Sequence, residues 1–293
     1  MWKWIGLKGW TVGIVATVLA AAAAVWLTGQ PTVGEAQAPA QGFKAPRLRG
    51  TNNPDLTGLW QAMVTANWDV QDHSAEQAPA VRQVGVWLAQ PPGQSIVEGG
   101  EIPYRKEALA KRQENFKNRL RVDHDNVNTV GDPEAKCFLP GVPRATYLPY
   151  PFQIIQSTDK IVIAYQFAGA SRTVPIGKPT EPPVDFWMGW SNGRWDGDTL
   201  VVDVKGFNDM TWFDRAGNYH SDALHVVERY TPITPYHMMY EATIEDPKVF
   251  TRSWKMSFPL YRRMENNAQY LEFKCVDLAE EYVYGGLVKR SSQ

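Results

Sequence analysis

The chain has 293 residues, of which 44% are apolar and 12% aromatic, enough for a substantial hydrophobic core. A formal net charge of −1 gives no general attraction to nucleic acid, so we expect no nucleic-acid partner. Two cysteines cannot build a structural zinc site alone, and the five histidines show no metal-binding spacing, so we expect neither metal nor cofactor.

The first thirty residues carry the strongest membrane signal. The run Thr11–Thr28 is apolar and holds no charged side chain. A run of this length predicts one transmembrane helix, because backbone polar groups in lipid must be bonded internally. Lys3 and Lys8 precede the run, and no lysine or arginine follows until Lys44. This asymmetry predicts a single-pass protein of the inner (cytoplasmic) membrane, with a cytoplasmic N-terminus and a periplasmic main domain.

Residues 1–30 are therefore expected to be a retained anchor. Indole rings suit the membrane interface, and small residues allow close packing against other helices. On these grounds the anchor residues are Trp10, Thr11, Gly13, Ala16, Ala20 and Trp26. The alternative is a cleaved signal peptide, with small-residue sites at 36–38 and 38–40. The apolar run exceeds the usual ~7–15 residues of a signal peptide, which favours retention.

Residues 31–54 are rich in Pro, Ala and Gly, which is typical of a linker. Residues 55–280 then predict a mainly β domain, an antiparallel barrel or sandwich, because about ten short strands are separated by turn signals. The expected strands are 59–68, 81–88, 152–156, 161–167, 171–176, 186–190, 199–204, 223–230, 236–245, 253–261 and 269–276. In 236–245 the inward set is Met238, Tyr240, Ala242 and Ile244. The pair Gly58 and Trp60 resembles the start of lipocalin-like barrels, in which the tryptophan fills the closed end.

One helix interrupts the strands, at 103–121, with a proline at its first position. Between residues 105 and 121 there are seven basic and two acidic residues. One interpretation is contact with anionic lipid heads or an acidic partner, and the other is a solvated face with an apolar stripe docked on the barrel. The candidate contact residues are Arg105, Lys106, Lys111, Arg112 and Lys117.

The densest polar and aromatic stretch lies at 206–225. A catalytic interpretation gathers His220, Asp214, Asp222 and His225 at a barrel mouth, with His220 as general base. The alternative is a structured loop in which Asp and Asn side chains bond backbone N–H groups. His220 and His225 differ by an odd number, so on one strand they would face opposite sides.

Three segments, 132–144, 193–203 and 220–230, resemble a family of exported bacterial β-barrel, lipocalin-like proteins that are mostly uncharacterised. The likeness covers roughly residues 54–278 and implies a Cys137–Cys275 disulfide. The family has no established activity to carry over. Together with the anchor, the domain is similar to an accessory subunit of a photosynthetic reaction-centre–light-harvesting complex.

Two functions follow as expectations. The first is a non-catalytic accessory subunit that stabilises a membrane complex, with other subunits and the lipid bilayer as partners and the tail 281–293 free to dock. The second is a periplasmic enzyme or small-molecule binder that uses the barrel interior near His220, Asp214 and Asp222. The lack of a convincing catalytic set favours the first.

Overall fold

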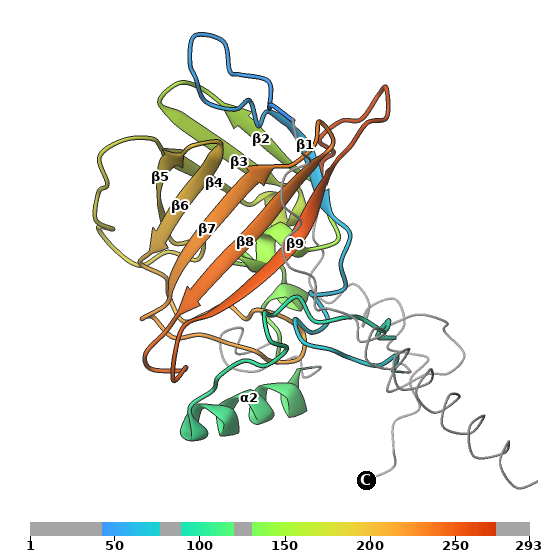
Figure 1. The fold of residues 1–293 in the computed structure, drawn as a ribbon. Helices are drawn as coiled ribbons and strands as arrows, with labels where there is room; N and C mark the ends of the chain where they lie inside the picture. Colours follow the sequence, from blue (N-terminus) through green and yellow to red (C-terminus); the bar gives the residue numbers. More distant parts are fainter. Residues whose placement is uncertain (1–42, 77–88, 120–130, 274–293) are drawn as a thin grey trace, which may run out of the picture. The chain divides into compact units, whose positions relative to one another are not determined.

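The computed structural model describes residues 43–76, 89–119 and 131–273, and every structural statement below refers to these residues. They form one antiparallel sheet of nine strands in the order β4-β3-β2-β1-β9-β8-β7-β6-β5 (Figure 1). The strands are β1 (Gly58–Ala62), β2 (Phe152–Gln156), β3 (Lys160–Tyr165), β4 (Ser171–Pro175), β5 (Trp190–Asp196), β6 (Thr199–Lys205), β7 (His225–Pro232), β8 (His237–Glu245) and β9 (Trp254–Arg262). The prediction of a mainly β, antiparallel fold is confirmed.

The end strands β4 and β5 come together and nearly close the sheet into a barrel. At this seam the described backbone forms one parallel bridge, between Ile176 and Gly193, and the Gly177 N–H donates to the Gly193 carbonyl oxygen at 3.3 Å. A Cβ atom on Gly193 would lie 2.6 Å from Ile176 Cδ1, so the missing side chain allows the close approach. Of the two predicted architectures, the structure has the barrel.

Alternate residues of each strand point into the barrel, as the two-residue period of a strand requires. In β8 the buried residues are the predicted set Met238, Tyr240, Ala242 and Ile244. The ring of Tyr240 packs on that of Phe258 from β9, with centroids 4.9 Å apart. Burial of each large apolar side chain contributes about 1.5–3 kcal/mol, so this interior is the main source of stability.

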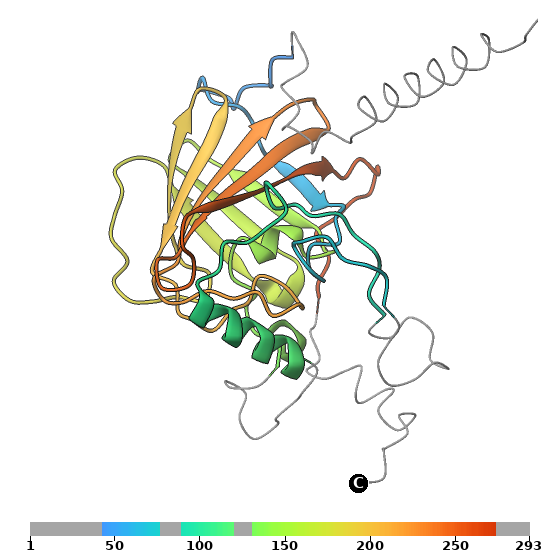
Figure 2. The same ribbon diagram turned by 60° about the horizontal axis from the view of Figure 1, so that its bottom comes forward.

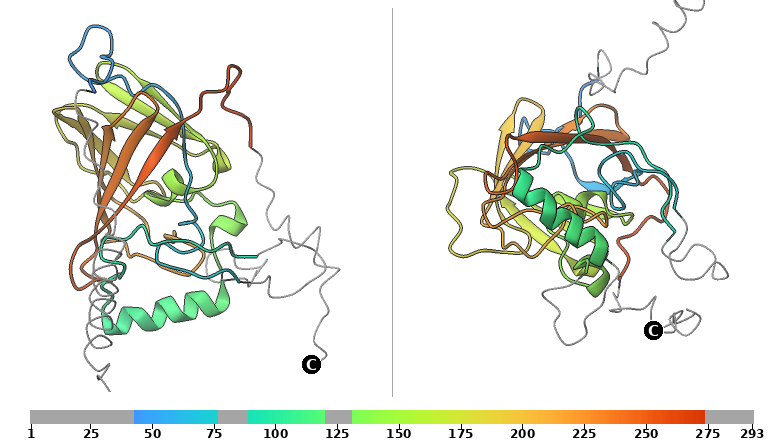
Figure 3. Two further views of the ribbon diagram at one scale, coloured as in Figure 1. Left: turned by 45° about the vertical axis from the view of Figure 1, so that its right-hand side comes forward. Right: turned by 90° about the horizontal axis from the view of Figure 1, so that it is seen from below.

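The barrel has two differently built ends. At the turn end lie the β2–β3, β5–β6 and β7–β8 turns, and residues 43–57 cross over them (Figure 1). The helix end is covered by α2 (Lys106–Asn118) and by the loop 206–224 (Figures 2 and 3). The short helix α3 (Arg144–Tyr147) is fully buried at this end, with 3₁₀ turns η1 (Glu134–Lys136) before it and η2 (Phe167–Gly169) after β3.

Helix α2 begins three residues later than the predicted start at Pro103. Tyr104 forms a β-bridge with Phe250, and the Arg105 N–H donates to the Val249 carbonyl oxygen at 2.9 Å. These contacts hold residues 103–105 extended, so Lys106 is the first helical residue. Tertiary pairing here outweighs the local preference of proline for a first helical position.

Several strand predictions differ from the structure. The predicted strand 59–68 ends at Ala62, because a turn at 66–68 follows. Of the predicted strand 186–190, Phe186 forms an isolated bridge with Phe207, and Trp190 is the first residue of β5. Residues 269–273 form no strand. Instead, the ring of Phe273 packs against the ring of Tyr150, with the ring centroids 4.7 Å apart. The predicted strand 81–88 lies outside the described residues.

The predicted linker 31–54 is too long at its C-terminal end, because residues 43–54 are folded onto the barrel. Ala45 is buried, the Leu48 N–H donates to the Asn53 carbonyl oxygen, and Arg47 pairs with Asp198. The predicted anchor 1–30, the rest of the linker and the tail 281–293 lie outside the described residues. None of the helices in the described ranges combines the length and the apolar composition that a membrane span requires.

Candidate functional site

The predicted general base, His220, is buried in the loop at the helix end. Its Nδ1 lies 2.9 Å from the Ser221 carbonyl oxygen and its Nε2 lies 2.6 Å from Thr211 Oγ1. Nδ1 must donate to the carbonyl, so Nε2 of the neutral ring accepts from the threonine hydroxyl. Burial lowers the pKa of His220, which keeps the ring neutral. The rings of Phe207 and Phe213 pack on it, so both its nitrogens and its faces are occupied.

The other predicted acid–base residues do not gather around His220. Asp222 is exposed and pairs with Lys248 at 2.6 Å. His225 lies on the outer face of β7, 2.9 Å from Asp203 and 3.2 Å from Glu245. The structured-loop interpretation therefore describes this region better than a barrel-mouth catalytic set.

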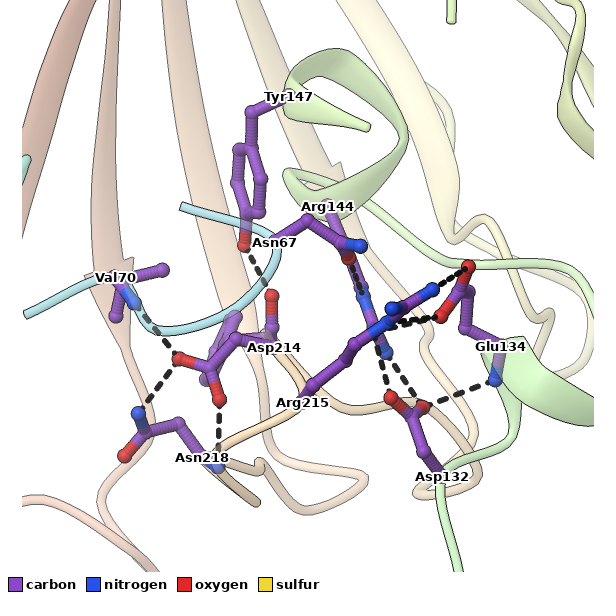
Figure 4. Close-up of polar contacts among 10 residues, drawn as sticks. Asn67, Val70, Asp132, Glu134, Arg144, Tyr147, Asp214, Arg215 and Asn218 are labelled. Atoms are coloured by element: carbon purple, nitrogen blue, oxygen red, sulfur yellow. Dashed lines mark hydrogen bonds and ion pairs between the residues drawn. The ribbon is translucent and has the colours of Figure 1, made fainter. Parts of the chain in front are cut away.

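Asp214 is the centre of a buried polar cluster (Figure 4). Its carboxylate accepts hydrogen bonds from Val70 N–H at 3.0 Å, Asn218 N–H at 3.1 Å and Asn218 Nδ2 at 2.7 Å. The same Asn218 amide reaches Asp69 at 3.3 Å, and Tyr104 donates to the Asn218 amide oxygen. Burial, with the charge of Asp69 added, raises the pKa of Asp214 to about 7, while the three N–H donors oppose the shift.

A second cluster, around Arg144 of α3, adjoins the first (Figure 4). The Arg144 guanidinium donates to both oxygens of Asp132 at 2.7 Å each and to the Asn67 amide oxygen at 2.9 Å. Glu134 lies between Arg144 and Arg215, and Arg215 binds it through Nε at 3.0 Å and Nη2 at 3.1 Å. Burial alone would lower the pKa of Arg144, but Asp132 and Glu134 raise it well above its usual value.

These two clusters join the segments 67–70, 132–144 and 214–218 beneath the barrel. Their charged groups face one another, and the described donors of each guanidinium meet carboxylate or amide oxygens. A buried ion pair of this kind fixes geometry, because removing one partner leaves an uncompensated charge and costs roughly 3–5 kcal/mol. The arrangement therefore supports a rigid loop assembly rather than an exposed reactive group.

A third charged cluster lies inside the barrel. Arg172 of β4 binds Glu228 of β7 through two hydrogen bonds of 2.5 and 2.8 Å. The hydroxyls of Tyr230 and Tyr240 donate to Glu228, and Tyr165 accepts from Arg172 Nε at 3.1 Å. Arg172 is 6% exposed and Glu228 is fully buried. These buried side chains lie in the interior between β4 and β7.

Sequence reasoning missed this pair, although one signal was available. Glu228 lies two residues from Val226 and two from Tyr230, on the inward face of its strand. A charged residue at an inward position needs an opposite charge, but the partner 56 positions away cannot be read from the pattern.

The predicted basic surface of α2 is smaller than its sequence suggests. Arg112 turns back to Asp69 at 3.6 Å, and Arg105 donates to the Pro247 carbonyl oxygen at 2.7 Å. Lys111 pairs with Glu114 at 3.3 Å on the exposed face. Lys106 and Lys117 remain as exposed cations, beside exposed acidic residues of the same helix. The solvated-face interpretation fits this mixed surface.

The turn end carries a groove with a volume of about 240 Å³. Arg262 forms part of its wall, with the guanidinium 4.4 Å above the Trp60 ring and hydrogen bonds to the Thr57 and Pro235 carbonyl oxygens. Gly58 permits this stacking, because a Cβ there would lie 2.3 Å from Arg262 Nη1. The lining residues are Phe43, Ala45, Pro46, Asp55, Leu56, Thr57, Trp60, Pro232, Thr234, Pro235, Tyr236, Arg262 and Met264.

The predicted Cys137–Cys275 disulfide stays a prediction, because Cys275 lies outside the described residues. No cluster of three or more His, Cys, Asp or Glu side chains in the described ranges is arranged to hold a metal ion. No protein-family model, curated protein or solved structure matches this chain.

Proposed function

We propose that the protein is a membrane-anchored periplasmic accessory subunit that stabilises a multi-subunit membrane complex. The observation that carries the proposal is the pairing of buried charges, in which Arg144 and Arg172 each meet a carboxylate within the fold. A body whose buried arginines are paired within the fold is suited to act through its outer surfaces and its rigidity. The predicted apolar run at 11–28 supplies the attachment.

In this proposal the anchor packs among other membrane helices. Gly13, Ala16 and Ala20 are small residues that let helix backbones approach closely in lipid. The barrel is held on the periplasmic side and contacts the outer parts of the complex, and the tail 281–293 can add to the contact. The motif likeness suggests a photosynthetic reaction-centre–antenna assembly as the complex.

The test is extraction of native membranes with a mild detergent, followed by native electrophoresis and identification of the co-migrating proteins. The full chain is expected in a high-mass complex with defined partners. A lone monomer, or a mature chain that begins after residue 38 in the soluble fraction, would contradict the proposal.

A matched pair of variants tests the packing surface. The triple variant Gly13→Leu, Ala16→Leu and Ala20→Leu should release the protein from the complex while it stays in the membrane, because bulky side chains prevent close helix approach. Val18→Leu enlarges the same predicted helix without filling the small-residue positions and should leave the complex intact. Equal behaviour of the two variants would argue against anchor packing.

A further inference from the structure

The turn end of the barrel is where the described chain begins. Phe43, the first described residue, lines the groove together with Ala45 and Pro46. The 42 residues before it include the run predicted to span the membrane. The chain therefore connects this run to the body at the turn end and not at the helix end.

Few residues join the predicted run to the described body. Fifteen steps along the chain separate Thr28 from Phe43. The nine residues of β8 span about 30 Å from the turn end toward the helix end. The chain therefore joins the predicted run to the body at the turn end, and the helix end lies about one barrel length from that junction.

The turn end also carries exposed apolar side chains. Tyr236 is 51% exposed and Met264 is 56% exposed, and both line the groove. Ile155, at the end of β2, is 50% exposed, and Tyr261 lies beside the groove on β9. Tyrosine is favoured at the headgroup level, where one end of the ring is apolar and the other is wet.

The charged residues of the turn end leave two cations without an ion pair among the described residues. Three carboxylates of the turn end are neutralised by arginine, in the pairs Arg47–Asp198, Arg229–Asp196 and Arg263–Glu265. Asp55 faces Arg262, and Asp159 lies beside Lys160. Lys44 and Arg49 are exposed and lie in no ion pair within the described part of the chain. A basic residue near an anionic membrane surface contributes about 1 kcal/mol of attraction.

We propose that the turn end, from Phe43 across Tyr236 to Met264, rests on the surface of an anionic bilayer. The inference depends on the proposed membrane attachment and adds which face of the body meets the lipid. Tyr236 and Met264 enter the headgroup layer, Lys44 and Arg49 contact anionic heads, and α2 points away from the membrane.

The experiment uses the full chain in vesicles of phosphatidylcholine and phosphatidylglycerol. Nitroxide labels are placed by Tyr236→Cys, by Met264→Cys and, as the control at the helix end, by Lys117→Cys; the unsubstituted chain gives the background from Cys137 and Cys275. Collision with oxygen, which concentrates in lipid, is compared with collision with a water-soluble nickel complex. On transfer from detergent to vesicles, the oxygen-to-nickel ratio should rise at 236 and 264 and stay unchanged at 117.

Each other result has a defined meaning. If the labels at 236 and 264 still collide freely with the nickel complex in vesicles, the inference is wrong. If they collide little with either reagent, the inference is also wrong, and the turn end is covered by protein instead of lipid. The double variant Lys44→Glu and Arg49→Glu should reduce the rise, whereas Lys106→Glu and Lys117→Glu should not; equal effects would also overturn it. If the chain does not float with the vesicles, both the proposed function and this inference fail. If the chain floats but its labels at 236 and 264 still collide with the nickel complex, only the inference fails.

Discussion

Arg172 and Glu228 face each other across the inside of the barrel, although their strands are not neighbours in the sheet. Arg172 lies on β4, at one end of the strand order, and Glu228 lies on β7, near the other end. The ion pair therefore links both sides of the seam, where the described backbone contributes a single bridge. Side chains complete a closure that the main chain leaves unfinished.

Removal of one partner of this pair should be costly. Glu228→Gln leaves Arg172 charged and buried without a counterion, so the free energy of unfolding should fall by roughly 3–5 kcal/mol. Denaturant unfolding of the full chain in detergent, followed by tryptophan fluorescence, measures the loss. The double variant Arg172→Met and Glu228→Leu should recover much of it, because both charges are gone. A single variant as stable as Lys248→Ala, which breaks an exposed pair, would disprove this role.

The geometry of Arg144 should matter more than its charge. Arg144→Lys keeps a cation but cannot bind both oxygens of Asp132 and reach Asn67 as well, so we expect a loss of about 2–4 kcal/mol. Arg215→Lys is the matched control, because its side chain is 27% exposed and water can replace part of its contact with Glu134. The same unfolding measurement should rank Arg144→Lys as the more damaging change. The opposite ranking would contradict the assignment of Arg144 as the centre of the cluster.

The Asp214 carboxyl should make stability depend on pH. Its pKa is raised from about 3.8 to about 7 in the folded chain, so the folded state binds more protons than the unfolded state between these values. Its contribution is therefore complete below pH 3.8 and is lost as the pH rises through 7, by at most about 4 kcal/mol. Asp69→Asn removes the neighbouring charge and should flatten this decline, whereas the exposed Asp222→Asn should not. Unfolding curves between pH 5 and 8 that stay parallel for wild type and Asp69→Asn would rule the coupling out.

His220 should make stability depend on pH in the opposite direction from Asp214. Burial lowers its pKa from about 6.5, so the unfolded chain takes up a proton that the folded chain refuses, and stability falls as the pH drops through that value. His220→Gln should weaken this acid sensitivity relative to wild type. His225→Gln changes a residue on the outer face of β7 and serves as the control. Thermal unfolding at pH 5 and pH 7 compares the three chains, and an equal pH response in all of them would contradict the buried neutral ring.

The sequence predicted what depends on local periodicity. Alternation of apolar and polar residues located β8 and its inward face correctly, because every second residue of a strand faces the same side. The same rule failed at Leu271 and Phe273, where alternation is present but no strand forms among residues 269–273. Periodicity indicates which residues share a face and does not supply the neighbouring strand that would pair with them.

Contacts between distant segments could not be predicted. The basic run at 105–121 suggested an open charged surface, yet Arg112 turns to Asp69 and Arg105 to the backbone at Pro247. One partner of Asp214, the Val70 N–H, and one partner of Arg144, the Asn67 amide oxygen, come from the segment 67–70, far away in the chain. Net charge can be counted from a sequence, but the fraction of it that stays available at the surface depends on the folded contacts.

The seam between β4 and β5 also sets the order in which the fold loosens. Backbone amides in β8 are hydrogen-bonded in ladders to β7 on one side and β9 on the other. Along the facing edges of β4 and β5, the described backbone contact is the single bridge at Gly193. Deuterium should therefore replace hydrogen first along the seam and last in the middle of the sheet. On heating, the edges of β4 and β5 should therefore separate before the central strands of the sheet do.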